Sequence, residues 1–216
     1  MMQVTNPILP GFNADPAILR HGEDYYIVTS TFEWFPGMSI YHSKDLCNWT
    51  HAANALTSPV QLDLRGLPDS AGAWAPDLTF KPTSNRFYLA FTKMKRMSPT
   101  FFDLDNYVVW AENPVGPWSE PIYLNSSGFD PAFYHDDEGR SWVANLSWEH
   151  RQGYPHPGVV VLQEYSEAEQ KLVGEPQPIY NGDRHFGCLE GPRIYRNGDY
   201  YYMLTAEGGT GYGHAV

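Results

Sequence analysis

The chain has 216 residues, of which 42% are hydrophobic and 15% aromatic, and its formal net charge is −11 at pH 7. The excess of Asp and Glu (25) over Lys and Arg (14), without any basic tract, argues against nucleic acid and anionic membranes as partners. No stretch approaches the ~20 apolar residues of a membrane span, and no secretory signal is recognisable, so we expect a cytoplasmic protein. Cys47 and Cys188 lack the spacing of a metal site or a disulfide framework and are expected to be free thiols.

A short motif recurs along the chain and divides it into four units. The sequences DPAI, APDL, DPAF and GPRI contain Pro16, Pro76, Pro131 and Pro192, at intervals of roughly 60 residues. After each proline come a short apolar run, a polar turn and a second run rich in aromatic or β-branched residues. This order is typical of a β-hairpin.

Further strands are predicted from the same pattern in chain order. A second strand is expected in each unit, at 25–30, 87–92, 141–147 and 200–206. A third strand is expected in the first three units, at 38–43, 106–112 and 158–165. Units of ~40–50 residues with three or four antiparallel strands are typical of β-propeller blades. The sequence therefore predicts an all-β propeller with about four blades and no helix of useful length.

Carboxylates stand at the head of three of the four units. Asp15 and Asp130 directly precede the repeat prolines, and Glu190 lies just ahead of the fourth. Proline biases the residue before it toward an extended backbone, which would hold Asp15 on a stiff segment. Since the innermost strand of each blade lines the central channel, we expect the three carboxylates to converge at one end of it. Asp before Pro is also a common turn starter, but a turn does not require acids in phase with a repeat.

At these motifs the sequence resembles glycoside hydrolase family 43, most closely its β-xylosidase branch. NPILPGFNADPAILR with YYIVTSTFEWFPGMSIYHSKDLCNW is similar to the first blade of that branch, GAWAPDLTF to the second, GFDPAFYHDDEGRSW to the third, and LEGPRIYRNGDYYYMLTAEGGTGYGHAV to the fourth. The resemblance implies a five-bladed β-propeller catalytic domain. Residues 1–216 would form about four of its blades, without the fifth blade and the C-terminal β-sandwich domain of that branch.

The resemblance also implies an inverting mechanism. No cofactor or catalytic metal ion is expected, because the eight histidines are scattered and the sequence has no His-x-x-x-His or Cys-x-x-Cys pattern. The resemblance assigns Asp15 as general base, Glu190 as general acid, and Asp130 as the residue that tunes and orients the acid. An inverting glycosidase needs one carboxylate to activate water and one carboxylic acid to protonate the leaving oxygen, ~6.5–9.5 Å apart. A third carboxylate near the acid disfavours its ionisation through like charge. By the same resemblance the residues expected to bind the sugar are Phe32, Trp34, Trp74, Ala75, Trp148 and Thr210, whereas Trp49, Trp118 and Trp142 are expected to pack within blades.

The leading hypothesis is an exo-acting β-1,4-xylosidase that releases xylose from xylo-oligosaccharides. An α-L-arabinofuranosidase of the same family is the first alternative, because the two pentoses present similar hydroxyls, and a truncated, inactive sugar-binding module is the second. Fructan-cleaving propellers also use three acids, but their Asn-Asp-Pro-Asn and Glu-Cys motifs differ from ADPA and LEGP here. A propeller that lacks a blade exposes strand edges. We therefore expect this length of chain to belong to a longer polypeptide or to a homo-oligomer, with poor solubility and little activity alone.

Overall fold

The computed structural model describes residues 4–98, 101–151, 158–182, 188–210 and 212–216. In these residues the chain folds into β-strands and turns, without a helix. The first three units each form a four-stranded antiparallel sheet, and the fourth forms a two-stranded sheet. The predicted all-β class and the four units are therefore confirmed. In the part of the chain that the structure describes, no helix is long and apolar enough to cross a membrane.

The strands follow one another within each sheet in chain order. The first sheet contains β1 (Ala14–His21), β2 (Asp24–Ser30), β3 (Gly37–Ser43) and β4 (Thr50–Leu56). The second contains β5 (Gly72–Lys81), β6 (Arg86–Ser98), β7 (Phe101–Ala111) and β8 (Ile122–Asn125). The third contains β9 (Ala132–His135), β10 (Ser141–Trp148), β11 (Gly158–Ser166) and β12 (Lys171–Tyr180), and the fourth contains β13 (Leu189–Asn197) and β14 (Tyr200–Glu207). Every predicted second and third strand falls on one of these strands.

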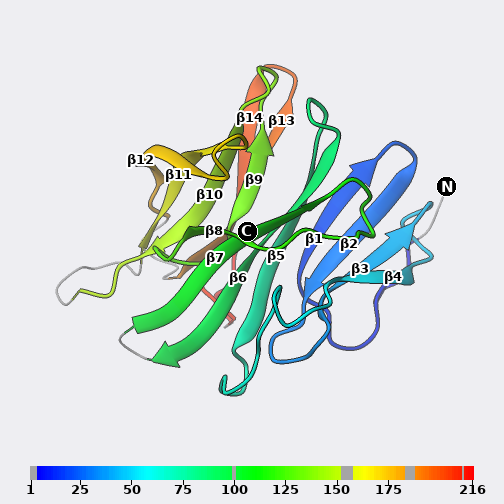
Figure 1. Cartoon of the computed structure of the whole chain (residues 1–216), viewed down its shortest axis with the longest axis horizontal. Helices are drawn as coiled ribbons and strands as arrows, with labels where there is room; N and C mark the ends of the chain where they lie inside the picture. Colours follow the sequence, from blue (N-terminus) through cyan, green and yellow to red (C-terminus); the bar gives the residue numbers. More distant parts are fainter. Residues whose placement is uncertain (1–3, 99–100, 152–157, 183–187, 211) are drawn as a thin grey trace.

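The four sheets are arranged as successive blades around the middle of the molecule (Figure 1). Their first strands are the innermost: β1 contacts β5, β5 contacts β9, and β9 contacts β13. The fourth strands β4 and β12 lie at opposite sides of the view in Figure 1. The beginning of each unit therefore lies at the channel, as the repeat predicts.

Apolar clusters between neighbouring blades hold the arrangement together. The second strand of the second blade shows why its sequence is a continuous apolar run. Leu89 and Phe91 pack toward the first blade, whereas Tyr88 and Ala90, on the opposite face, pack toward the third. Side chains alternate between the two faces of a strand, so a strand buried on both faces needs apolar residues at every position.

The inner strands share one backbone irregularity, which differs from the extended conformation expected before proline. Asp15, Ala75, Asp130 and Gly191 precede the four repeat prolines, and their φ angles are 49°, 43°, 58° and 58°. This left-handed conformation costs a residue with a Cβ roughly 1–2 kcal/mol. The pairing register of β1, β5 and β13 shifts at the same point. Each of these strands therefore bulges there, and the demand of the bulge outweighs the local preference set by proline.

Candidate active site

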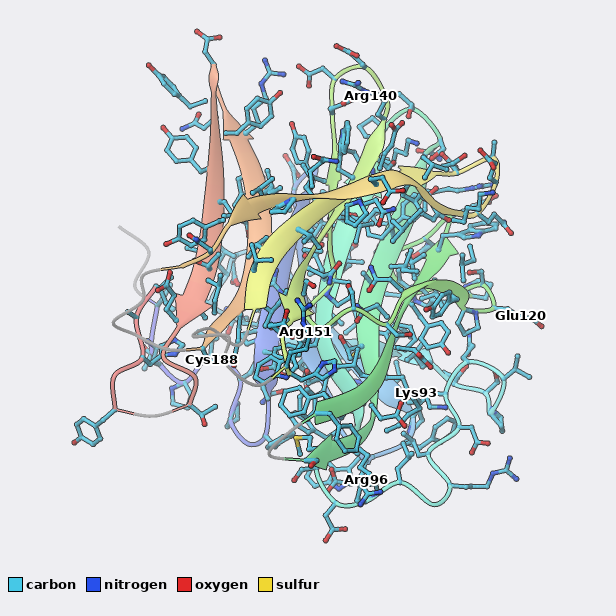
Figure 2. The ribbon with its side chains drawn as sticks, turned by 90° about the vertical axis from the view of Figure 1, so that its left-hand side faces the viewer. Lys93, Arg96, Glu120, Arg140, Arg151 and Cys188 are labelled. Carbon is cyan, nitrogen blue, oxygen red and sulfur yellow. The ribbon has the colours of Figure 1, made fainter. Side chains whose placement is uncertain are left out.

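A cavity of about 500 Å³ opens where the inner strands begin. Its lining includes the three predicted acids Asp15, Asp130 and Glu190. Ala75 and Thr210, two of the residues expected to bind the sugar, line the same cavity. In Figure 2, Cys188 marks this end of β13, and Arg140, in the turn after β9, marks the opposite end of the blades. The structure thus brings together carboxylates from three different blades.

Asp15 is exposed at the cavity and is oriented by a hydroxyl from its own blade. The hydroxyl of Ser30, on the neighbouring strand β2, donates to Asp15 Oδ2 at 2.6 Å. Ser30 Oγ also accepts a hydrogen bond from the backbone N–H of Ala75, in the second blade, at 2.7 Å. The orientation of the Asp15 carboxylate is therefore tied to the junction between the first two blades.

Asp130 is held by a side-chain hydroxyl of the second blade and a backbone N–H of the fourth. Its N–H donates to Thr92 Oγ1 of the second blade at 3.1 Å, and its Oδ2 accepts from the N–H of Gly191, in the fourth, at 2.8 Å. Protein surrounds the carboxyl on most sides, although one face stays open to the cavity. Burial, then the nearby Glu190 and also Asp15, raise the pKa of Asp130 to about 7. Like charges gathered in a poorly solvated site disfavour the ionised form.

The hydrogen bonds of Ser30 and Thr92 follow one rule. In each case a hydroxyl on the second strand of one blade accepts the N–H of the residue before the repeat proline in the next blade. At the third junction that N–H belongs to Gly191, and the Asp130 carboxylate accepts it instead. The Asp130 carboxylate therefore makes the hydrogen bond that joins the third blade to the fourth, and it also lines the cavity.

Glu190 reaches the cavity from a different backbone position than the two aspartates. It lies one residue ahead of the left-handed Gly191, where the second and third blades carry Trp74 and Phe129. The Cys188 thiol donates to Glu190 Oε1 at 2.7 Å. Burial and the neighbouring carboxylate raise the pKa of this thiol well above its usual range, so it stays protonated and remains a donor. Cys188 is a free thiol, as predicted.

The aromatic residues expected to wall the sugar site form a row beside the acids rather than lining the cavity itself. The centroid distances along the row are 5.4 Å for Phe12–Phe32, 5.6 Å for Phe32–Trp74, 6.5 Å for Trp74–Phe129 and 5.7 Å for Phe129–Trp148. Because Trp74 and Phe129 directly precede Ala75 and Asp130 in sequence, the row borders the cavity. Contact of these rings with a sugar stays a prediction.

Four other tryptophans differ in how far they are buried. Trp118 is buried in the cluster between the first two blades, as expected for blade packing. Trp34 is 59% exposed and packs edge-on against Phe12, with ring centroids 5.2 Å apart. Trp49 and Trp142 are half-buried and donate their ring N–H groups to Leu46 O and Asp136 Oδ2.

Arg193, Ser30 and Cys188 also belong to the site, although the sequence motifs did not predict a role for them there. Arg193 lines the cavity and donates from Nε to Asp77 Oδ1 at 3.1 Å. The sequence does contain a signal for Arg193, because it places a charge directly after the repeat proline, where the first and third units have alanine. Among the described residues, no group of three or more His, Cys, Asp or Glu is arranged to hold a metal ion.

Comparisons with known proteins give consistent matches over the whole chain. The family model described as "Glycosyl hydrolases family 43" matches residues 4–216. Xylosidase/arabinosidase 43B of Humicola insolens is 54% identical over 215 residues, which are 100% of this chain and 39% of that protein. Beta-xylosidase of Bacillus subtilis (strain 168) is 51% identical over 216 residues, which are 100% of this chain and 40% of that protein.

Solved structures agree with the sequence comparisons. The crystal structure of xylan beta-1,4-xylosidase from Bacillus halodurans C-125 superposes with a TM-score of 0.94 at 53% identity, over 99% of this chain and 40% of that one. The chain therefore has the propeller-type fold of that protein over the matched part. It spans about 40% of the length of the relatives it matches.

Proposed function

Because the chain belongs to glycosyl hydrolase family 43, we propose that it carries the acids of an exo-acting β-1,4-xylosidase that inverts the anomeric configuration. The proposed substrates are xylo-oligosaccharides, which release xylose. The observation that carries this proposal is the meeting of Asp15, Asp130 and Glu190 at one cavity of about 500 Å³. This volume lies within the usual range of small-molecule sites.

In the proposed reaction Asp15 acts as the general base. Water attacks the anomeric carbon on the face opposite the leaving oxygen, and Asp15 accepts the proton that the water loses. The exposed position of Asp15 at the cavity leaves room for this water, and the bond from Ser30 fixes the orientation of the carboxylate. A fixed orientation matters because catalysis depends on the geometry of the attacking group.

Glu190 acts as the general acid in this proposal. It gives its proton to the glycosidic oxygen as the bond from that oxygen to the anomeric carbon breaks, so the leaving sugar departs as a neutral alcohol. Asp130 accepts the N–H of Gly191, the residue next to the acid, and thereby orients the strand that carries Glu190. Charges balance, because Asp15 gains one proton and Glu190 loses one.

A second candidate function is α-L-arabinofuranosidase activity. It is supported by the name of the Humicola insolens relative, xylosidase/arabinosidase, at 54% identity. Rates on an aryl β-xyloside and on an aryl α-L-arabinofuranoside separate the two: a higher kcat/KM on the arabinofuranoside would overturn the xylosidase proposal. Binding of xylobiose without any turnover would favour a sugar-binding module instead.

The test of the mechanism combines stereochemistry with leaving-group dependence. NMR of the first product should show α-xylose from a β-linked substrate, and retained configuration would refute the base assignment. Glu190→Gln should lose far more rate on xylobiose than on an aryl xyloside whose leaving group departs without a proton. Asp15→Asn should lose rate on both. Asp199→Asn, in the exposed turn at the far end of the Glu190 hairpin, is the control and should keep wild-type rates.

A further inference from the structure

The residue directly after each repeat proline follows a pattern around the channel. The first and third blades have Ala17 and Ala132 at this position, and both are buried. The second and fourth blades have Asp77 and Arg193, which carry opposite charges. The Arg193 Nε lies 3.1 Å from Asp77 Oδ1. An ion pair thus joins two blades that are not neighbours in chain order, and the alanines of the other two blades have side chains small enough to leave it room.

The remaining polar contacts of this pair reach the other two blades. Asp77 Oδ2 accepts the N–H of Phe133, in the third blade, at 2.9 Å. Arg193 Nη2 donates to the carbonyl of Pro76 at 2.8 Å, and Nη1 donates to the carbonyl of Pro16, in the first blade, at 3.4 Å. These prolines directly follow Ala75 and Asp15, which line the cavity. The Asp77–Arg193 pair therefore connects all four blades at the wall of the cavity, whose lining includes Pro16 and Arg193.

The pair separates two cavities. Arg193 lines the 500 Å³ cavity with the acids and also a second cavity of about 210 Å³, whose lining includes Asp77 and His135. The side chains of Arg193 and Asp77 are only 20% and 8% exposed. A buried ion pair seldom stabilises a fold more than a well-packed apolar pair would, because both charges lose their hydration. Stability alone is therefore a weak explanation for this pair.

We propose that Asp77 and Arg193 are positioning residues of the active site, forming the floor of its cavity and fixing β13, which carries Glu190, relative to β1 and β5. This inference rests on the proposed glycosidase function. Glu190 and Arg193 lie on the same strand, three residues apart, so a shift of the arginine moves the acid with it. A displacement of ~1 Å in a catalytic group can cost ~100-fold in rate.

The test uses variants of the whole protein. Asp77→Asn with Arg193→Gln removes both charges together, so no unpaired buried charge is left to unfold the protein. Arg193→Lys keeps the charge but loses the planar fork that reaches two carbonyls as well as Asp77.

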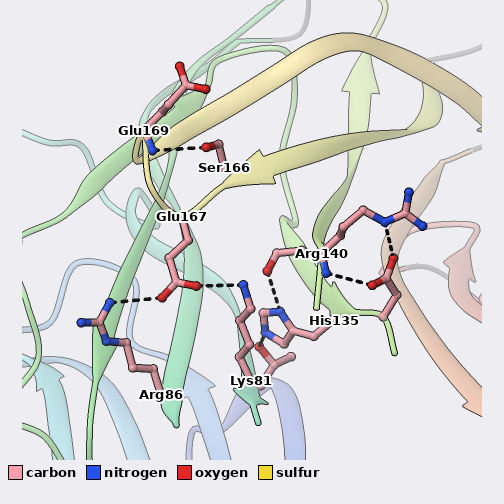
Figure 3. A network of polar contacts seen from close by, with 10 residues as sticks. Lys81, Arg86, His135, Arg140, Ser166, Glu167 and Glu169 are labelled. Carbon is pink, nitrogen blue, oxygen red and sulfur yellow. Dashed lines mark hydrogen bonds and ion pairs between the residues drawn. The ribbon is translucent and has the colours of Figure 1, made fainter. Parts of the chain in front are cut away.

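The matched control is a buried ion pair away from the cavity. Lys81, whose side chain is 7% exposed, contacts Glu167 Oε2 at 2.8 Å and joins the second blade to the third. Figure 3 shows Lys81 and Arg86 converging on Glu167. Lys81→Met with Glu167→Gln removes this pair and should destabilise the fold to a comparable degree.

The expected result is a selective loss in kcat. On xylobiose the Asp77→Asn, Arg193→Gln variant should lose ~100-fold in kcat with KM within ~3-fold, and it should lose much less on an activated aryl xyloside, which does not need the acid. Arg193→Lys should recover part of the xylobiose rate. The Lys81 control should keep both rates within ~2-fold. Equal losses on the two substrates, or equal losses in the control, would overturn the proposal.

A second measurement does not depend on activity. The Gly191 N–H, which donates to Asp130, should exchange with solvent ~10-fold faster or more in the Asp77→Asn, Arg193→Gln variant and at the wild-type rate in the control. If the unmodified protein hydrolyses neither substrate, the proposed function fails, while exchange at Gly191 still decides whether the ion pair holds β13. Unchanged exchange would overturn the inference.

Discussion

Asp130→Asn is expected to make the protein more stable at neutral and alkaline pH while it removes activity. The asparagine side chain has nearly the same size, and its carbonyl oxygen can still accept the N–H of Gly191. The substitution therefore removes the ionisable group and leaves the connection between the third and fourth blades in place.

The magnitude follows from the pKa of Asp130, which burial, Glu190 and Asp15 raise from 3.8 to about 7. Between these two values the folded protein keeps a proton that the unfolded chain has already released. The free energy of unfolding therefore falls as pH rises through this window. At about 1.36 kcal/mol per pKa unit, the full shift would lower the free energy of unfolding by about 4 kcal/mol. Because one face of the carboxyl is open to the cavity, we expect about half of this, ~2 kcal/mol.

The assay is denaturant unfolding of the wild type and of Asp130→Asn at several values of pH. The two should have similar stability near pH 4, and the variant should become ~2 kcal/mol more stable by about pH 8. Asp199→Asn, at an exposed turn, is the control and should show no such divergence. A variant that is less stable than the wild type at pH 8, or a difference that does not depend on pH, would refute the argument.

Three further predictions concern other parts of the molecule. Ser30→Ala removes the hydroxyl shared by Asp15 and the Ala75 N–H, so kcat should fall ~10-fold on xylobiose and on aryl xyloside alike, with ~1–2 kcal/mol lost in unfolding experiments. Burial, with Lys81 second, lowers the pKa of His135 from 6.5 to about 4, so the folded state keeps it neutral. Stability should therefore fall by up to ~3 kcal/mol as pH drops from about 6.5 to about 4, and His135→Asn should flatten that limb of the stability curve. Leu89→Ala, at a side chain with no exposure, should cost ~2–5 kcal/mol by urea unfolding without changing KM.

The repeat was the part of the fold that sequence could predict. Strand alternation and hairpin turns depend on neighbouring residues, so the second and third strands of the units were identified correctly from short patterns. The extended conformation predicted for Asp15 before Pro16 is wrong, for a physical reason. The preference of an X-Pro pair is a local bias, whereas the left-handed conformation recurs at all four equivalent positions and coincides with a register shift in β1, β5 and β13. Asp15 and Asp130 both have this left-handed conformation and both line the cavity, so a part of the site depends on backbone geometry that the local X-Pro preference does not predict.

The convergence of the acids was predictable, but their partners were not. Asp15, Asp130 and Glu190 lie at the beginning of three repeat units, which was enough to expect them at one end of the channel. All three line the cavity. The Asp77–Arg193 pair joins positions 116 residues apart, and neither residue stands out when its motif is considered alone. Alignment of the four repeats against each other, rather than comparison of each with a family motif, would have revealed two opposite charges at one equivalent position.

The four equivalent positions before the prolines also explain how one backbone geometry serves different roles. Asp15, Ala75, Asp130 and Gly191 share the left-handed conformation and all line the cavity, but only two of them are acidic. An aspartate at the fourth position would add another carboxylate to a group that already raises the pKa of Asp130. Glycine adopts the conformation without strain and presents its N–H to Asp130, so the longer Glu190 side chain can approach from the preceding residue. Because the fourth blade has Gly191 at the position before the proline, Glu190 can reach the cavity as the third acid without a second side chain beside it.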